Sequence, residues 1–216
     1  SRKPMVPMCV RSFGRIRLQS KFIQKSSCIG RFSDAALSHF NEGNTSMIDS
    51  KSKAIMDWIE DNSSILERTN AALWEYAETA FEEKQSSEYL KKELKDYGFR
   101  IFPGAKGVPT SFVAEWGSGK PVIGLLAEYD ALPGLSQERS TECKPHKIGA
   151  PGHACGHCTL GTAVLGAALA LKVCMEENHT PGTIRFYGCP AEETVEGKVF
   201  MSRDHLFDDC DAALSW

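Results

Sequence analysis

A cluster of histidine and cysteine, directly followed by an apolar segment, is the feature that most restricts how this chain can fold. Residues Gly152–Cys158 (GHACGHC) hold two of the six histidines and two of the eight cysteines. An apolar stretch then runs from Leu160 to Met175. Gly152 and Gly156 allow the backbone to bend sharply, because glycine accepts dihedral angles that other residues resist. We therefore interpret the cluster as a loop that enters the first turn of a buried helix.

From the residues alone, the cluster allows three interpretations. Thiolate and imidazole donors held this close can bind a zinc- or manganese-type cation, and the positive end of the following helix would favour Cys155 as a thiolate. Cys155 and Cys158 also form a C-x-x-C pair, which occurs in thiol-disulfide proteins and in zinc knuckles. A four-thiolate knuckle is disfavoured because the sequence has no second C-x-x-C. A metal site, a redox pair and simple packing residues all stay open.

Length and composition limit the class of protein. The chain has 216 residues and a hydrophobic fraction of 42%, which suits a globular domain of ordinary to large size. A formal net charge of -3 gives no reason to expect a nucleic-acid partner. No charge-free apolar run reaches the roughly twenty residues that span a bilayer, so no membrane partner is expected. The cysteines are scattered, unlike those of small secreted domains, which favours a reducing compartment.

Residues 1–33 have a composition of their own. They contain eight Lys and Arg residues, several serines, and no Asp or Glu. Arg-rich, Ser-rich and acid-free segments are typical of organelle transit peptides. A disordered basic tail, a nucleic-acid-binding arm and translation upstream of Met47 are the alternatives. We therefore exclude residues 1–46 from the fold as a disordered or targeting segment, and we expect a cytoplasmic or mitochondrial protein whose N-terminus is incomplete or processed.

A helical pattern predicts a scaffold between Ser50 and Tyr97. Apolar residues recur there at helical spacing in three stretches. The third stretch ends just before a glycine, which suits a left-handed helix cap. The carboxylates of Glu75, Glu82 and Glu83 are interpreted as a solvated face.

After Gly98 the spacing of apolar residues changes from the helical repeat to the alternation expected of strands. The segment 121–127 is almost wholly apolar, as in a strand covered on both faces. With helices between the strands, the order of elements predicts an α/β fold with a parallel sheet. Strands are predicted at residues 111–116, 121–127, 183–188 and 211–216, with a short helix at 197–206.

Two pairs of carboxylates follow two of these strands. Glu128 and Asp130 come after the second predicted strand and point the same way in extended chain. Glu192 and Glu193 come after the third, and burying both is unfavourable unless a cation offsets their charge. Ligands of open α/β sheets bind at the carboxyl ends of strands. We therefore expect both pairs to meet the cluster 152–158 at one edge of the sheet, which is the arrangement that metal-assisted hydrolysis needs.

Three ordered motifs resemble those of a known family. Glu-Tyr-Asp-Ala-Leu-Pro-Gly at 128–134, Gly-His-Ala-Cys-Gly-His at 152–157 and Pro-Ala-Glu-Glu at 190–193 are similar to the motifs of aminoacylase/carboxypeptidase-type dinuclear metallohydrolases. Within that family, the chain looks most like aminobenzoyl-glutamate hydrolases and auxin-conjugate amidohydrolases. The resemblance covers about residues 47–216. It implies a three-layer αβα sandwich of the zinc-exopeptidase (phosphorylase/hydrolase-like) type, incomplete here and without the family's lid domain.

The resemblance also implies roles for the site residues and a pair of divalent cations, zinc or manganese. Glu192 would act as general base and acid. Asp130 would orient a metal ligand or the attacking water. The implied metal ligands are Cys155, as a bridging thiolate, His157 and Glu193.

Other residues of the motifs and the length of the chain depart from the family. Glu128 stands where other branches place a histidine ligand, and Cys158 stands where relatives often carry Asp or Asn, so neither is given a role. Family members are about twice this long, dimerise through the inserted lid and have two further histidine ligands beyond the position of Trp216. We therefore expect the chain alone to bind metal weakly and to turn over its substrate slowly or not at all.

The expected function is metal-dependent hydrolysis of an amide bond in an N-acyl amino acid or dipeptide-like substrate of the aminobenzoyl-glutamate type. The expected partner is therefore a small molecule, and the family usually forms homodimers. Two alternatives stay open. One is a truncated, non-catalytic metal-binding or regulatory form of such an enzyme. The other is a thiol-disulfide protein that uses Cys155 and Cys158.

Overall fold

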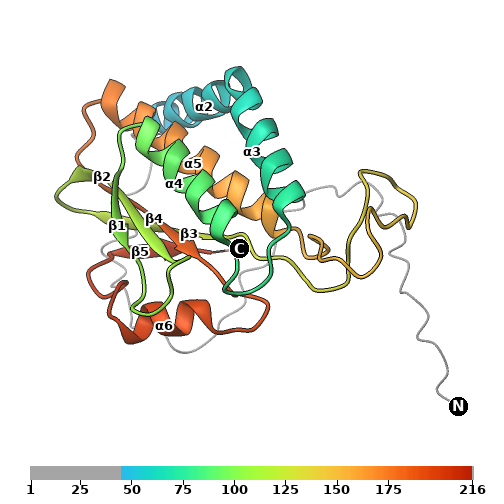
Figure 1. Ribbon diagram of the computed structural model, residues 1–216. Helices are drawn as coiled ribbons and strands as arrows, with labels where there is room; N and C mark the ends of the chain where they lie inside the picture. The colour runs from blue at the N-terminus through green and yellow to red at the C-terminus, as the bar shows by residue number, and fades with distance from the viewer. Residues whose placement is uncertain (1–44, 216) are drawn as a thin grey trace, which may run out of the picture. The chain divides into compact units, whose positions relative to one another are not determined.

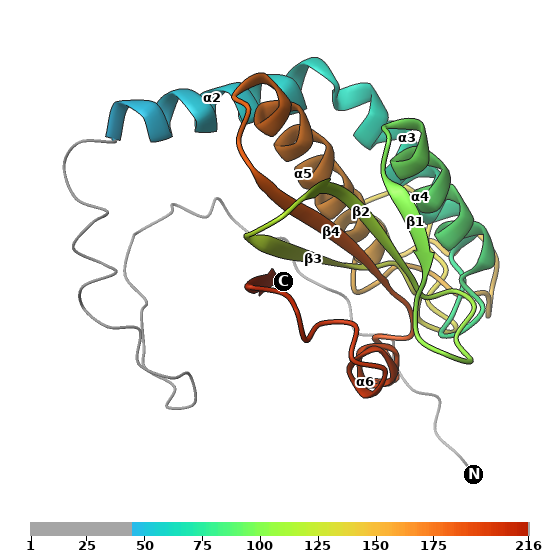
Figure 2. The same cartoon turned by 90° about the vertical axis from the view of Figure 1, so that its left-hand side faces the viewer.

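The computed structural model describes residues 45–215 and shows a mixed five-stranded sheet with helices on both faces (Figures 1 and 2). The predictions for residues 1–46 lie outside this range, apart from Thr45 and Ser46 at the start of the first helix. The elements before the donor cluster are α2 (Thr45–Asp61), α3 (Ser63–Tyr76), α4 (Lys84–Asp96), β1 (Arg100–Pro103), β2 (Phe112–Ser118) and β3 (Val122–Glu128). Those after it are α5 (His157–Glu177), β4 (Gly182–Cys189), α6 (Gly197–Arg203) and β5 (Ala212–Leu214).

The sheet has the order β1-β2-β4-β3-β5 and is only partly parallel. β3 pairs in parallel with β4 and β5, as predicted. β2 is antiparallel to both β1 and β4, so the sheet is mixed, whereas the sequence analysis expected a parallel sheet. A short turn joins β2 to β3, and parallel strands need a longer crossover to return the chain to the same end. The sequence pattern also missed β1, a four-residue edge strand that ends in a proline and is largely exposed.

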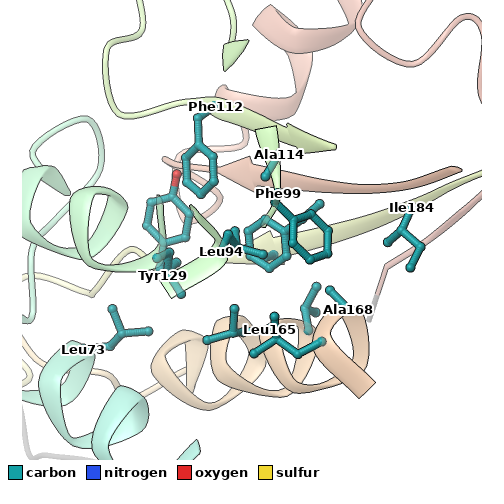
Figure 3. Packing of buried hydrophobic residues seen from close by; sticks show 14 of the residues in the cluster. Leu73, Leu94, Phe99, Phe112, Ala114, Tyr129, Leu165, Ala168 and Ile184 are labelled. Carbon is teal, nitrogen blue, oxygen red and sulfur yellow. The ribbon is translucent and has the colours of Figure 1, made fainter. Parts of the chain in front are cut away.

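Alternate side chains of the strands enter two separate cores. Phe112 of β2 faces the helices α3, α4 and α5 (Figure 3). Phe186 of β4 is buried in the same cluster. Val113 and Tyr187, their neighbours in sequence, face the other side and pack with Met201 of α6. Side chains of a strand point alternately to opposite faces of the sheet, so both faces of β2 and β4 are covered. The expected αβα layering is confirmed, although α6 is the only α-helix among the described residues on its side.

The long apolar helix α5 is the central element of the larger core. By length and hydropathy it could cross a membrane, but more than half of its most apolar window is buried inside the fold. Val164, Leu165, Ala168 and Leu169 are buried in the cluster formed with the sheet and α3 (Figure 3). Packing against the sheet accounts for the apolar character of α5 on most of its surface.

A glycine of α5 lets this helix approach the end of β3 closely. A Cβ atom at Gly161 would lie 2.6 Å from the backbone oxygen of Glu128, whereas a Cβ at Gly166 would meet only the flexible side chain of Leu66, at 2.9 Å. We expect Gly161→Ala to lower the free energy of unfolding by about 1–3 kcal/mol, because the helix or strand backbone must shift. Gly166→Ala is the matched control, and its gain in helix propensity of roughly 1 kcal/mol keeps it near or above the wild type. Urea unfolding followed by circular dichroism measures both, and equal stability of the two variants would contradict the prediction.

Candidate metal centre

The candidate site lies where β3 and β4 end and α5 begins. Glu128, the last residue of β3, is paired with Cys189, the last residue of β4. The two strands are parallel, so the segments that follow them leave the sheet at the same edge. α5 connects these strands and starts at this edge with His157, directly after Gly156 in a left-handed conformation (φ 90°). The topology therefore brings the three sequence motifs together.

Asp130 and His157 form the buried centre of the site. Nδ1 of His157 lies 2.9 Å from Oδ1 of Asp130 and 3.1 Å from its backbone oxygen. Oδ2 of Asp130 accepts the backbone N–H of Glu193 at 2.9 Å. The carboxylate is an acceptor, so we assign the Nδ1 proton to this bond, which directs Nε2 of the ring away from Asp130. A carboxylate that fixes the ring of a histidine in this way is typical of the surroundings of a metal ligand.

Three carboxylates surround Nε2 of His157. The distances from Nε2 are 3.3 Å to Oε2 of Glu128, 3.6 Å to Oε2 of Glu192 and 3.9 Å to Oε1 of Glu193. Two overlapping groups of donors result, each with its atoms within 4.8 Å of one another. The first group is Cys155, His157 and Glu193, and the second is Glu128, His157 and Glu192.

The donor chemistry of this site fits divalent cations. Oε1 of Glu193 is buried and has no hydrogen-bond partner among the described residues. A buried carboxylate oxygen without a partner is unfavourable unless a cation or a proton compensates it. Thiolate, imidazole and carboxylate are the ligands that zinc takes in proteins. The structure thus brings the three predicted ligands together, and their role as ligands stays a prediction.

Burial and neighbouring charges control the protonation of these groups. Burial acts against the charged form of His157, but the hydrogen bond to Asp130 and the nearby carboxylates outweigh it and raise the pKa of the imidazole. Burial also acts against the charged form of Asp130, but His157 and the backbone N–H of Glu193 outweigh it and lower the pKa of that carboxyl.

The expectation that the start of α5 favours a Cys155 thiolate is wrong for the chain by itself. Partial burial, followed by the charge of Glu193, raises the pKa of the Cys155 thiol above its ordinary value. Both effects disfavour a further negative charge at this position. A thiolate at residue 155 therefore requires a compensating positive charge.

Lys198 is a charged residue of the site that the sequence analysis did not identify. It lies near the start of α6, and its Nζ donates to Oε1 of the largely buried Glu128. The ion pair compensates one carboxylate and leaves Oε2 of Glu128 directed toward His157. The sequence places Lys198 five positions after Glu193 on a predicted helix. No local pattern indicates a partner 70 positions away.

The solvated face predicted for three glutamates is correct for two of them. Glu75 and Glu82 are exposed, but Glu83 is fully buried. Oε1 of Glu83 accepts the backbone N–H of Ala191 at 2.8 Å, and burial raises the pKa of this carboxyl. The prediction for Glu83 is wrong because the loop after α3 turns it into the interior. Two adjacent glutamates give no sign in the sequence of which one will be covered.

Cys155 and Cys158 occupy different surroundings. Cys155 is exposed in the donor group described above, whereas Cys158 is buried among the apolar side chains of the larger core. The two residues form no disulfide, and burial raises the pKa of the Cys158 thiol. The structure therefore gives the redox-pair interpretation no support.

Comparison with known proteins agrees with the sequence motifs. Residues 124–215 match peptidase family M20/M25/M40. Over these residues the chain is similar to M20 peptidases. The resemblance inferred from the three motifs is thereby confirmed. The match starts within β3 and extends past β5, so it includes every proposed ligand and the proposed base.

M20-type hydrolases are found among the similar curated proteins. One of the subunits of the p-aminobenzoyl-glutamate hydrolase of Escherichia coli is 49% identical over 146 residues, which cover 67% of this chain and 30% of that protein. The IAA-amino acid hydrolase ILR1-like 6 of Arabidopsis thaliana is 36% identical over 154 residues, which cover 70% and 32%. The chain therefore spans about a third of the length of these relatives.

A solved M20 structure shares the fold. The YXEP protein of Bacillus subtilis, described as a dinuclear metal binding peptidase from the M20 family, matches with a TM-score of 0.58 at 25% sequence identity. The match covers 68% of this chain and 40% of that one. The mixed sheet with its helices thus matches part of the fold of an M20 metallopeptidase.

Proposed function

We propose that this protein is a metal-dependent amidohydrolase that cleaves the amide bond of an N-acyl amino acid or dipeptide-like substrate of the aminobenzoyl-glutamate type. The proposal depends mainly on one observation: two groups of possible metal ligands share His157. Glu193 belongs to one group, and its neighbour in sequence, Glu192, belongs to the other. The relatives named for the hydrolysis of p-aminobenzoyl-glutamate and of IAA-amino acids support the choice of substrate class.

Cys155, His157 and Glu193 would hold the metal in the proposed site, and Asp130 would keep the ring of His157 in the orientation described above. The buried, unpartnered oxygen of Glu193 and the negative surroundings of Cys155 favour two divalent cations, zinc or manganese. When bound, such cations polarise an amide carbonyl and lower the pKa of water.

Glu192 is the residue that we propose to move protons. Its side chain is 35% exposed, more than that of Glu193 at 17%, so a substrate can reach it. Its carboxylate accepts a proton from the attacking water as the water oxygen bonds to the carbonyl carbon. The same carboxyl then gives the proton to the leaving nitrogen as the C–N bond breaks. No proton is gained or lost by the enzyme over the cycle.

Partners and location are further parts of the proposal. We infer a small-molecule substrate, a homodimer of the kind usual in the family, and a cytoplasmic or mitochondrial location. The acid-free composition of residues 1–33 supports the location, and the family resemblance supports the dimer. Light scattering that finds a monomer would contradict the dimer, and cell fractionation that finds the protein elsewhere would contradict the location.

A cobalt titration with an activity assay tests the metal site and the function together. We expect Co²⁺ added to the chelator-stripped chain to produce a thiolate-to-cobalt charge-transfer band. Cys155→Ser should abolish this band, and the matched control Cys143→Ser, which alters an exposed loop cysteine, should retain it. Hydrolysis of a panel of N-acyl amino acids, including p-aminobenzoyl-glutamate, should require the metal and stop with chelator.

The same titration at several pH values tests the protonation of the ligands. The pKa values of Cys155 and His157 are raised in the chain by itself, so a cation must displace protons from them. We expect the apparent metal affinity to increase with pH, by about tenfold per pH unit for each proton displaced, until the ligands are deprotonated. Metal binding without hydrolysis would favour a non-catalytic metal-binding form, and the absence of binding would overturn the whole proposal.

A further inference from the structure

The turn that carries Glu192 and Glu193 has an unusual backbone. Ala191 and Val195 have φ angles of 54° and 61°, although neither is glycine. The turn closes on itself through bonds from the N–H of Val195 to the oxygen of Glu192 (2.7 Å) and from the N–H of Glu196 to the oxygen of Ala191 (3.2 Å). A non-glycine residue in this conformation costs on the order of 1–3 kcal/mol, so surrounding contacts must hold it.

Two buried carboxylates hold this turn from other parts of the chain. Oε1 of Glu83 accepts the N–H of Ala191 at 2.8 Å, and Oδ2 of Asp130 accepts the N–H of Glu193 at 2.9 Å. The two N–H groups lie on either side of Glu192. Glu83 is 0% exposed and Asp130 is 1% exposed, so both bonds are shielded from water. Hydrogen bonds shielded from water in this way are stronger than exposed ones.

The loop that carries Glu83 is also attached to the segment that carries Asp130. The N–H of Ala131 donates to the backbone oxygen of Glu78 at 2.7 Å, and Thr79 forms a parallel bridge with Ala131. Oε1 of Glu83 accepts a second bond, from the N–H of Phe81 at 3.0 Å, which fixes its own loop. The loop between α3 and α4 thus joins the two segments from which the acidic side chains of the site project.

We infer that Glu83 is a positioning residue for hydrolysis: by holding the N–H of Ala191, it fixes the backbone from which Glu192 and Glu193 extend. This inference rests on the proposed function, in which Glu192 moves protons and Glu193 binds metal. Glu83 contacts neither the substrate nor a cation in this role. Without it, the buried N–H of Ala191 loses its acceptor and the turn loses an attachment to another part of the chain.

Three variants of Glu83 separate positioning from simple stability. Glu83→Gln keeps an acceptor oxygen at the same reach, Glu83→Asp keeps the charge but shortens the side chain, and Glu83→Ala removes the acceptor. Glu93→Ala is the matched control, because Glu93 is a buried carboxylate of α4 whose side chain pairs with Arg68 of α3 at 2.8 Å. All are made in the full chain.

Hydrogen exchange of the metal-free chain is the first measurement, because it does not depend on activity. We expect Glu83→Ala and Glu83→Asp to exchange at least about tenfold faster than the wild type in a peptide covering residues 190–196. Glu83→Gln should stay within about threefold. Glu93→Ala should lower the unfolding midpoint without a selective change in this peptide. If Glu83→Ala does not fold, the comparison of Glu83→Asp with Glu83→Gln decides.

Metal affinity and kinetics form the second measurement. Glu83→Ala and Glu83→Asp should bind Co²⁺ about tenfold more weakly, the usual range for loss of an outer residue of a metal site, and should lower kcat with little change in KM. Glu83→Gln should keep the Co²⁺ affinity and the kcat of the wild type. If hydrogen exchange in the peptide 190–196 were as slow in Glu83→Asp and Glu83→Ala as in the wild type, the inference would be overturned. A wild-type chain that binds metal without hydrolysing any amide would instead contradict the proposed function, while the exchange result would still decide the role of Glu83.

Discussion

Glu192→Gln is expected to lower kcat for amide hydrolysis by about 10³-fold, within the range of roughly 10²–10⁴ that general acid–base groups contribute. Glutamine has nearly the same shape but cannot take up and return the proton. The side chain of Glu192 is partly exposed, so the substitution should leave the fold intact. Steady-state kinetics with saturating metal, together with the metal content of the purified variant, measure the effect.

Glu196→Gln is the matched control for this prediction. Glu196 is an exposed carboxylate four positions further along the same turn and belongs to neither donor group. It should keep activity close to that of the wild type. If Glu192→Gln retained more than about a tenth of the activity, Glu192 would not be the general base. If it lost its metal instead, Glu192 would be assigned as a ligand.

Asp130→Asn should weaken metal binding by about 10–100-fold, with a parallel loss of activity. The carboxylate of Asp130 accepts two bonds, from the ring of His157 and from the N–H of Glu193. An asparagine has only one acceptor atom, so one of these donors must face an NH₂ group. The ring of His157 or the backbone of Glu193 then moves. Competition titration against a chromogenic chelator measures the change in affinity.

Asp211→Asn provides the comparison at the opposite end of β3. Its carboxylate also accepts a backbone N–H, that of Val122 at 2.6 Å, but it lies at the amino end of the strand, away from the donors. This variant should bind metal as the wild type does. Equal metal affinity of the Asp130→Asn chain and the wild type would show that Asp130 does not orient the ligands.

The part of the site predicted from the sequence is the part encoded in short segments. Cys155 and His157 stand two positions apart beside glycines, and Glu192 directly precedes Glu193 after an apolar strand. Apolar periods also located β3, β4 and α5. Since the carboxyl ends of parallel strands meet at one edge, these local patterns suffice to predict the convergence that the structure shows.

Other features could not be predicted because they depend on contacts between distant segments. No sequence pattern indicates that Glu83 is buried against Ala191, a contact across 108 positions, or that Lys198 pairs with Glu128 across 70. A charged side chain is recognised as buried only when its partner is known. The pairing of β2 with β4 was missed for the same reason, because apolar alternation does not reveal which strand lies alongside.

The amino-acid sequence by itself determined most of the elements, the candidate donor residues and their order along the chain, since each depends on neighbours within one turn or strand. Only the tertiary structure decided how the donors are protonated and held. Burial and neighbouring carboxylates raise the pKa of Cys155, and carboxylates that outweigh burial raise that of His157. The turn that carries Glu192 and Glu193 is held by carboxylates from separate segments. Electrostatic and hydrogen-bond energies depend on distance in space and on burial, and neither quantity exists until the chain has folded.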